Sequence, residues 1–133
     1  MEDTDKLVII QSSAVQATIP SFSVKFASLG DLISEDGSNY PQVILLGEII
    51  RCESQWKNVC NQKYGCNAGQ GIAQIIPSTI KYCEEKLERK IDPFNERDNL
   101  DCAMWLLVNE GWEHWGTAIT SWGSYNCFKA YIP

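Results

Sequence analysis

Residues 40–52 carry the densest run of apolar side chains in the chain. Ser38 and Asn39 suit an N-terminal cap and Pro41 suits a first turn, so a helix is predicted to begin here. The apolar positions in this run are Val43, Ile44, Leu45, Leu46, Ile49 and Ile50. Because they surround the helix instead of forming one stripe, the helix is predicted to be largely buried.

The remainder of the chain after this helix alternates helical patterns with turns. Glycines at positions 65, 69 and 71 make residues 58–71 a predicted loop. A helix over about residues 78–90, a Pro turn, a second helix near residue 102, another turn and a last helix follow. We therefore expect a mainly α, α+β fold, in which one helical domain over residues 38–133 carries a small loop or β-hairpin lobe.

Residues 1–37 form the least regular part of the sequence. Two short apolar stretches, at residues 7–10 and 22–26, have the pattern of strands, but Ser, Thr, Gln and Pro residues separate them. An N-terminal arm that is extended or partly disordered fits this composition equally well. No stretch approaches the ~18 consecutive apolar residues of a membrane-spanning helix, so no span is predicted.

Length and charge narrow the class of protein. A chain of 133 residues with 44% hydrophobic positions suits one domain, and we expect a monomer. The net charge of −6 and the absence of a basic cluster argue against a nucleic-acid partner.

The six cysteines predict disulfides. Their number is even, no two of them form a C-x-x-C pair, and a single His gives little support for a metal site. Buried free thiols are the alternative. Spacing alone leaves several pairings open, and helix placement favours one set: Cys60–Cys66 across a turn, Cys83–Cys102 between successive helices, and Cys52–Cys127 as the remainder. Disulfides favour a secreted or extracytoplasmic, cell-envelope location.

Glu53 is the candidate acid. It lies at the end of the buried helix, no Asp occurs between residues 36 and 92, and the one His is His114. Desolvation there would favour the protonated carboxyl, which is how a Glu becomes a general acid near neutral pH. The alternative is an ordinary surface Glu beside Arg51.

Four blocks of sequence, in order, resemble the soluble lytic transglycosylases of the lysozyme-like superfamily. Glu53-Ser54 resembles the E-S pair with the family's catalytic acid, and residues 71–79, GIAQIIPST, resemble its G-L-M-Q-I-M-P-x-T motif. Asp92-Pro93 with residues 99–106 is similar to the D-P-x-x-N-I helix, and residues 118–122, AITSW, to the A-L-A-A-Y stretch. The resemblance covers residues from about 38 to 128.

Several positions depart from that family. Ala73 stands where the motif has a Met against the sugar, and the Y-N block matches either Trp122-Gly123 or Tyr125-Asn126. The cysteines also lie outside the family's usual pattern, which indicates a disulfide-stabilised branch.

The resemblance implies a glycan cleft and cleavage of the β-1,4 bond between N-acetylmuramic acid and N-acetylglucosamine in peptidoglycan. Glu53 would act first as acid and then as base, with no cofactor and no metal. Ser54 would orient the Glu53 carboxyl, or else bond its own helix backbone. The residues expected to contact substrate are Ser54, Trp56, Gln74, Ile75, Trp122 and Tyr125.

Two other functions stay open on the sequence. One is a lysozyme-type hydrolase, in which Asp92, Asp98 or Asp101 would reach the cleft from a distant helix as the second carboxylate. The other is a non-catalytic cell-wall binding or structural module that keeps the fold.

Overall fold

The computed structural model describes residues 28–117 and 122–133. The chain divides between Asp31 and Leu32 into two units, and the account below concerns the second. The second unit runs from Leu32 to Pro133, and near its start Asn39 donates to the Leu32 carbonyl and accepts from the Ser34 amide. Of the N-terminal arm expected over residues 1–37, residues 1–27 lie outside the described residues.

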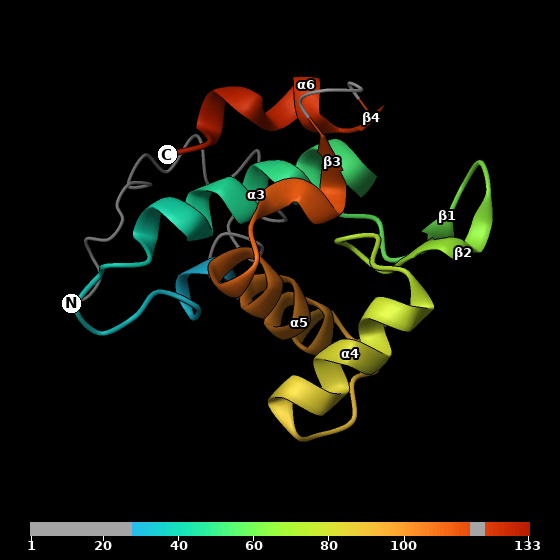
Figure 1. The fold of residues 1–133 in the computed structure, drawn as a ribbon, viewed down its shortest axis with the longest axis horizontal. Coiled ribbons are helices and arrows are strands. Elements are labelled where there is room, and N and C mark those ends of the chain that lie inside the picture. Colours follow the sequence, from blue (N-terminus) through green and yellow to red (C-terminus); the bar gives the residue numbers. More distant parts are fainter. Residues whose placement is uncertain (1–27, 118–121) are drawn as a thin grey trace, which may run out of the picture. The chain divides into compact units, whose positions relative to one another are not determined.

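The second unit is mainly α with two small antiparallel sheets, which confirms the expected mixture of elements (Figure 1). The helices are α3 (Tyr40–Ser54), α4 (Pro77–Leu87), α5 (Glu96–Asn109) and α6 (Tyr125–Phe128), with 3-10 helices η2 (Trp112–Trp115) and η3 (Lys129–Tyr131). The strands are β1 (Cys60–Asn61), β2 (Gly65–Gln70), β3 (Gly116–Thr117) and β4 (Trp122–Gly123).

Helix α3 is as buried as its sequence predicts. Pro41 lies in its first turn, and Asn39 occupies the capping position without a side-chain cap, since its amide holds the preceding turn. The fully or almost fully buried residues are Val43, Leu45, Leu46, Ile49 and Ile50. Gln55 ends the helix in the left-handed conformation, where its amide donates to the last carbonyls.

Helix α5 packs between α3 and α4 and completes the core. Leu100, Ala103 and Leu106 of α5 are completely buried. The three disulfides are the pairs favoured above: Cys83–Cys102 joins α4 to α5, Cys60–Cys66 closes the hairpin, and Cys52–Cys127 joins α3 to α6. Since α4 and α5 are amphipathic helices of 11 and 14 residues, packing and the disulfide hold them more than intrinsic helix propensity does.

The first sheet is a hairpin within the glycine-rich segment. β1 pairs with β2 in antiparallel register, Cys60 with Gln70 and Asn61 with Gly65, with an irregularity between the two pairs. Gln70 extends the pairing to Ile75 through two backbone hydrogen bonds of 3.0 and 3.1 Å. The hairpin therefore continues directly into residues 71–79, the GIAQIIPST block.

Among the described residues, no helix has the length and apolar character needed to cross a membrane, and no group of three or more His, Cys, Asp or Glu could hold a metal.

Candidate functional site

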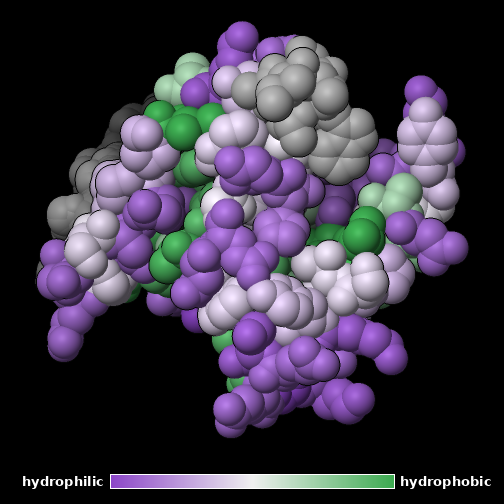
Figure 2. Space-filling model, in the orientation of Figure 1, coloured by the Kyte–Doolittle hydropathy of each residue, from purple (hydrophilic) through white to green (hydrophobic). Residues whose placement is uncertain are grey.

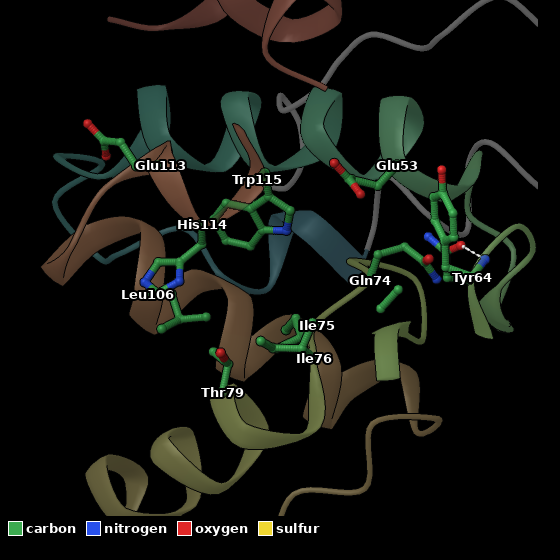
Figure 3. Close-up of a pocket in the computed structure, with 12 residues that line it drawn as sticks. Glu53, Tyr64, Gln74, Ile75, Ile76, Thr79, Leu106, Glu113, His114 and Trp115 are labelled. Carbon is green, nitrogen blue, oxygen red and sulfur yellow. Dashed lines mark hydrogen bonds between the residues drawn. The ribbon is translucent and has the colours of Figure 1, made fainter. Parts of the chain in front are cut away.

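Glu53 projects from the last turn of α3 into a pocket (Figure 3). Burial raises the pKa of its carboxyl above the usual 4.5, and a hydrogen bond from the Ser124 hydroxyl partly offsets that rise. Arg51 does not neutralise it, since its Nε lies 2.8 Å from Glu48 Oε1. The desolvation expected at the end of this helix is therefore present, and the surface ion pair with Arg51 is not.

A buried asparagine fixes the loop beside Glu53. Asn99, from α5, is completely buried; its Oδ1 accepts from the Ala73 amide at 2.9 Å, and its Nδ2 donates to the Gln70 and Pro93 carbonyls at 3.1 and 2.9 Å. The oxygen and both amide hydrogens of one side chain thus bond backbone groups on two separate segments, the loop at residues 70–73 and the turn at Pro93.

Gly71 lets the loop approach Asn99 so closely. Its φ is +75°, and a Cβ there would overlap the Pro93 carbonyl oxygen and the Asn99 side chain. The glycine of the motif is therefore required for both its conformation and its lack of a side chain.

Gln74 follows in the left-handed conformation with φ of 56°. Its Nε2 donates to the Val59 and Gly71 carbonyls, both at 2.9 Å, so both amide hydrogens are used on the hairpin and loop. The side chain lines the pocket, and its carbonyl oxygen remains for a bound molecule.

The pocket is a partly open cleft of about 740 Å³ between the end of α3, the hairpin, α4 and η2. Its lining residues are Glu53, Asn61, Tyr64, Ala68, Gln74, Ile75, Ile76, Thr79, Leu106, Glu113, His114 and Trp115. Polar side chains cover α4, while apolar ones reach the surface between that helix and the hairpin (Figure 2). Ile76, 41% exposed, belongs to this apolar region.

The two ends of the cleft have different chemistry. Glu53 lies near Tyr64 and Gln74 at one end, while Glu113 and His114 lie at the other (Figure 3). Trp115 lies between them and is almost completely buried, with its indole N–H donating to the Ala73 carbonyl at 2.8 Å. The middle of the cleft is therefore aromatic and aliphatic, and its ends are polar.

A hydrogen-bonded chain holds the far end. The Tyr82 hydroxyl donates to Glu110, and His114 Nε2 lies 2.9 Å from Glu110 Oε1. The hydrogen bonds from Tyr82 and His114 lower the pKa of Glu110, and the bond to Glu110 raises the pKa of Tyr82. Because Glu110 accepts as a carboxylate, Nε2 of His114 carries the hydrogen and Nδ1 is the nitrogen left for other partners.

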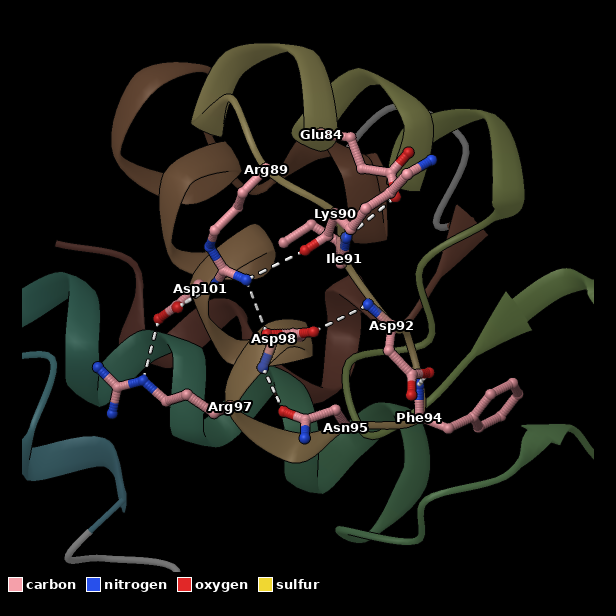
Figure 4. Close-up of polar contacts among 10 residues, drawn as sticks. All are labelled: Glu84, Arg89, Lys90, Ile91, Asp92, Phe94, Asn95, Arg97, Asp98 and Asp101. Atoms are coloured by element: carbon pink, nitrogen blue, oxygen red, sulfur yellow. Dashed lines mark hydrogen bonds and ion pairs between the residues drawn. The ribbon is translucent and has the colours of Figure 1, made fainter.

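The aspartates considered as second acids do not line the cleft. Asp98 and Asp101 pair with Arg89 at 2.8 and 2.5 Å, and Arg97 also pairs with Asp101 (Figure 4). Asp98 also accepts from the Asp92 amide at 2.9 Å, and this bond, followed by that of Arg89, lowers its pKa. These residues instead hold the turn between α4 and α5, so the alternative in which one of them supplies a second carboxylate gains no support from their positions.

The expected substrate contacts divide into two groups. Gln74 and Ile75 line the cleft, whereas Ser54, Trp56 and Tyr125 are not among its lining residues. The Ser54 hydroxyl bonds the Ile50 and Ile72 carbonyls at 3.3 and 2.5 Å, so the backbone alternative describes it.

The remaining aromatic candidates lie elsewhere. The Tyr125 ring packs on Trp112 with centroids 5.0 Å apart. Trp56 occupies the left-handed turn after α3, with φ of 66°, and is half-buried. Trp122 forms β4, and its side chain lies outside the described residues.

Three residues of this site have no sequence signal of their own. Tyr64 reaches the cleft from the hairpin tip, Ser124 reaches Glu53 from the segment before α6, and Glu113 lies in η2. Their positions depend on how separate elements pack. Trp115 both lines the cleft and belongs to the buried core.

Comparison with models of known protein families, with curated proteins and with solved structures gave no match.

Proposed function

We propose that this chain is a lytic transglycosylase that cleaves the β-1,4 bond between N-acetylmuramic acid and N-acetylglucosamine in peptidoglycan. The observation that carries the proposal is a buried carboxyl of raised pKa, Glu53, at one end of a cleft in which the described residues provide no second carboxylate beside it. Three of the sequence blocks that resemble this family contribute lining residues to this cleft: Glu53, residues 74–76 with Thr79, and Leu106. The proposal includes a lysozyme-like fold for this chain.

The chemistry assigns two roles to Glu53. In its protonated form it gives its proton to the leaving glycosidic oxygen as C1 of the muramic acid gains oxocarbenium character. The resulting carboxylate then takes the proton of that sugar's C6 hydroxyl, whose oxygen closes onto C1 to give a 1,6-anhydro end. Burial favours the acid form before the first step, and the Ser124 hydrogen bond favours the carboxylate that the second step needs.

The carboxylate geometry supports this route over hydrolysis. Retaining glycosidases place their two carboxyls about 5–5.5 Å apart and inverting enzymes about 6.5–9.5 Å apart. Besides Glu53, the carboxylate among the described lining residues is Glu113, whose side chain points away from Glu53 at the opposite end of the cleft (Figure 3). A hydrolytic water would therefore lack an obvious activating partner beside Glu53.

The cleft walls suit an amino-sugar polymer. Ile76, which is exposed, provides apolar surface for a pyranose face, while the other apolar lining residues, Trp115, Ile75 and Leu106, are buried. Gln74, Asn61 and Thr79 provide hydrogen-bonding groups at the rim of the cleft. Ala73, where the family motif has Met, is fully buried beneath Trp115, so the indole occupies this part of the wall.

The test compares two isosteric variants on purified peptidoglycan, with products identified by mass spectrometry. Glu53→Gln removes the transferable proton and keeps the volume, so turnover should fall by at least ~10² to 10⁴ while glycan binding persists. Glu113→Gln is the matched control and should stay within a few-fold of wild type.

The products decide among the three functions. Anhydro ends that disappear with Glu53→Gln support the proposal. Reducing ends in their place would indicate a hydrolase, and binding of glycan strands without turnover by the wild-type protein would indicate a non-catalytic module.

A further inference from the structure

Four residues form a closed ring of bonds at Glu53. Cys52 precedes Glu53 in α3 and is joined to Cys127 of α6 by a disulfide. The Cys127 amide donates to the Ser124 carbonyl at 2.8 Å, and the Ser124 side chain lies close enough to the Glu53 carboxyl to lower its pKa as a hydrogen-bond partner. The ring contains one covalent cross-link between elements 75 residues apart, and it closes on the candidate catalytic side chain.

Ser124 is also tied to the cleft wall. Its amide donates to the Trp115 carbonyl at 3.0 Å, next to the β3–β4 pairing of Gly116 with Gly123. Its own carbonyl accepts from Cys127 and Phe128, which begins the short helix α6. The backbone of Ser124 is therefore held from the cleft on one side and from the disulfide on the other.

We propose that Ser124 is a positioning residue for Glu53, and that the Cys52–Cys127 disulfide holds its hydroxyl against the carboxyl. The catalytic consequence rests on the proposed function, whereas the positioning itself does not. A hydrogen bond requires placement to within about 0.5 Å, and a four-residue helix has little intrinsic stability with which to provide it.

The location of this disulfide differs from that of a core cross-link. Cys83 and Cys102 are completely buried between α4 and α5, whereas Cys127 is exposed. Phe128, which is also completely buried, keeps α6 attached to the core by apolar packing. Opening Cys52–Cys127 should therefore loosen the placement of Ser124 without detaching the helix.

The positions of other charged groups do not substitute for Ser124 at the Glu53 carboxyl. Arg51 has its Nη2 3.7 Å from both sulfurs and its Nε on Glu48. Burial and the Ser124 hydrogen bond are the two causes of the pKa shift of Glu53. The elements around it carry the following other titratable or charged groups: Tyr40, Glu48 and Arg51 of α3, Lys63 and Tyr64 of the hairpin, Glu113 and His114 of η2, Tyr125 of α6, and Lys129 and Tyr131 of η3.

The experiment measures the Glu53 carboxyl directly, by NMR titration of protein labelled with ¹³C at the glutamate side-chain carboxyl. The Glu53 signal is assigned by its loss in Glu53→Gln. Ser124→Ala is made in three backgrounds: the native disulfides, Cys52→Ala/Cys127→Ala, and the control Cys60→Ala/Cys66→Ala, which removes the hairpin disulfide instead.

In the native and control backgrounds, Ser124→Ala should move the titration midpoint of Glu53 to higher pH, because it removes a bond that favours the carboxylate. In the Cys52→Ala/Cys127→Ala background the same substitution should leave the midpoint unchanged. Equal shifts in all three backgrounds would overturn the role of the disulfide, and no shift in the native background would overturn that of Ser124.

Two further results are decisive. A Cys52→Ala/Cys127→Ala protein that does not fold, even at 10 °C in sucrose, would make the disulfide a requirement of the fold and overturn its positioning role. If the titrations behave as expected but peptidoglycan is not cleaved, the proposed function fails and the positioning stands.

Discussion

Asn99→Ala should be among the most damaging single substitutions in this chain. The side chain is completely buried and bonds Gln70, Ala73 and Pro93. Truncation leaves the Ala73 amide and the Pro93 carbonyl without these partners, whereas the Gln70 carbonyl still accepts from the Ile75 amide. An unsatisfied buried group costs about 1–3 kcal/mol, so two groups at about 1.5 kcal/mol each reduce the free energy of unfolding by about 3 kcal/mol.

Urea unfolding followed by tryptophan fluorescence provides the assay. With a slope of about 2 kcal/mol/M, a loss of about 3 kcal/mol lowers the unfolding midpoint by about 1.5 M. Asn109→Ala is the matched control: the exposed Asn109 side chain bonds only its own helix, at the Trp105 carbonyl 2.9 Å away, and should change the stability by less than about 0.5 kcal/mol.

Asn99→Asp separates the acceptor from the donors. Aspartate keeps an oxygen for the Ala73 amide but directs a carboxylate at the Gln70 and Pro93 carbonyls, so it should be no more stable than Asn99→Ala. If Asn99→Ala unfolds at the same urea concentration as Asn109→Ala, the buried amide does not hold the cleft loop and the reasoning is refuted.

Three other predictions concern the same structure. The raised pKa of Glu53 means that the folded state binds its proton more tightly than the unfolded state; this contribution to stability is complete below pH 4.5 and is lost as the pH rises through the folded-state pKa. Glu53→Gln should therefore unfold at higher urea than wild type at pH 7 and lose that advantage near pH 4; an advantage that is the same at both pH values would exclude burial as the cause. Gly71→Ala should lower the free energy of unfolding by at least ~2 kcal/mol, because a left-handed backbone costs about 1–2 kcal/mol and the new Cβ overlaps the Pro93 carbonyl. Gly65→Ala, with φ of +87° but open space around it, should cost only the backbone part. Equal urea midpoints for the two variants would contradict this. Limited reduction and alkylation of the native protein should label Cys66 and Cys127 before Cys83 and Cys102, which are completely buried, and peptide mapping that finds Cys83 labelled first would be inconsistent with the core.

Local patterns in the sequence account for much of the fold. The apolar residues of α3 surround the helix, so burial of that helix and desolvation of Glu53 at its end follow from the sequence alone. The glycine-rich segment predicts a loop because glycines and turn residues act over a few positions, and the structure forms its hairpin there. Cys60–Cys66 followed from a short turn and Cys83–Cys102 from two successive helices, which left Cys52–Cys127 as the remaining pair.

Contacts between distant segments required the tertiary structure. Ser124 lies 71 positions beyond Glu53, and its hydroxyl reaches the carboxyl only because α6 packs on α3. The neighbouring Ser54 was the local candidate, but helix geometry directs its hydroxyl to the Ile50 and Ile72 carbonyls.

The positions of Asp98 and Asp101 away from the cleft also depend on contacts between distant segments. Arg97 is a helical neighbour that pairs with Asp101, but Arg89 reaches both Asp98 and Asp101 only because α4 and α5 lie side by side. Hydrophobic periodicity and turn chemistry act within a few residues, so the sequence alone determines the helices, the hairpin and the buried position of Glu53. Which side chains meet Glu53 depends on the packing of segments far apart in the chain, so only the tertiary structure decides it.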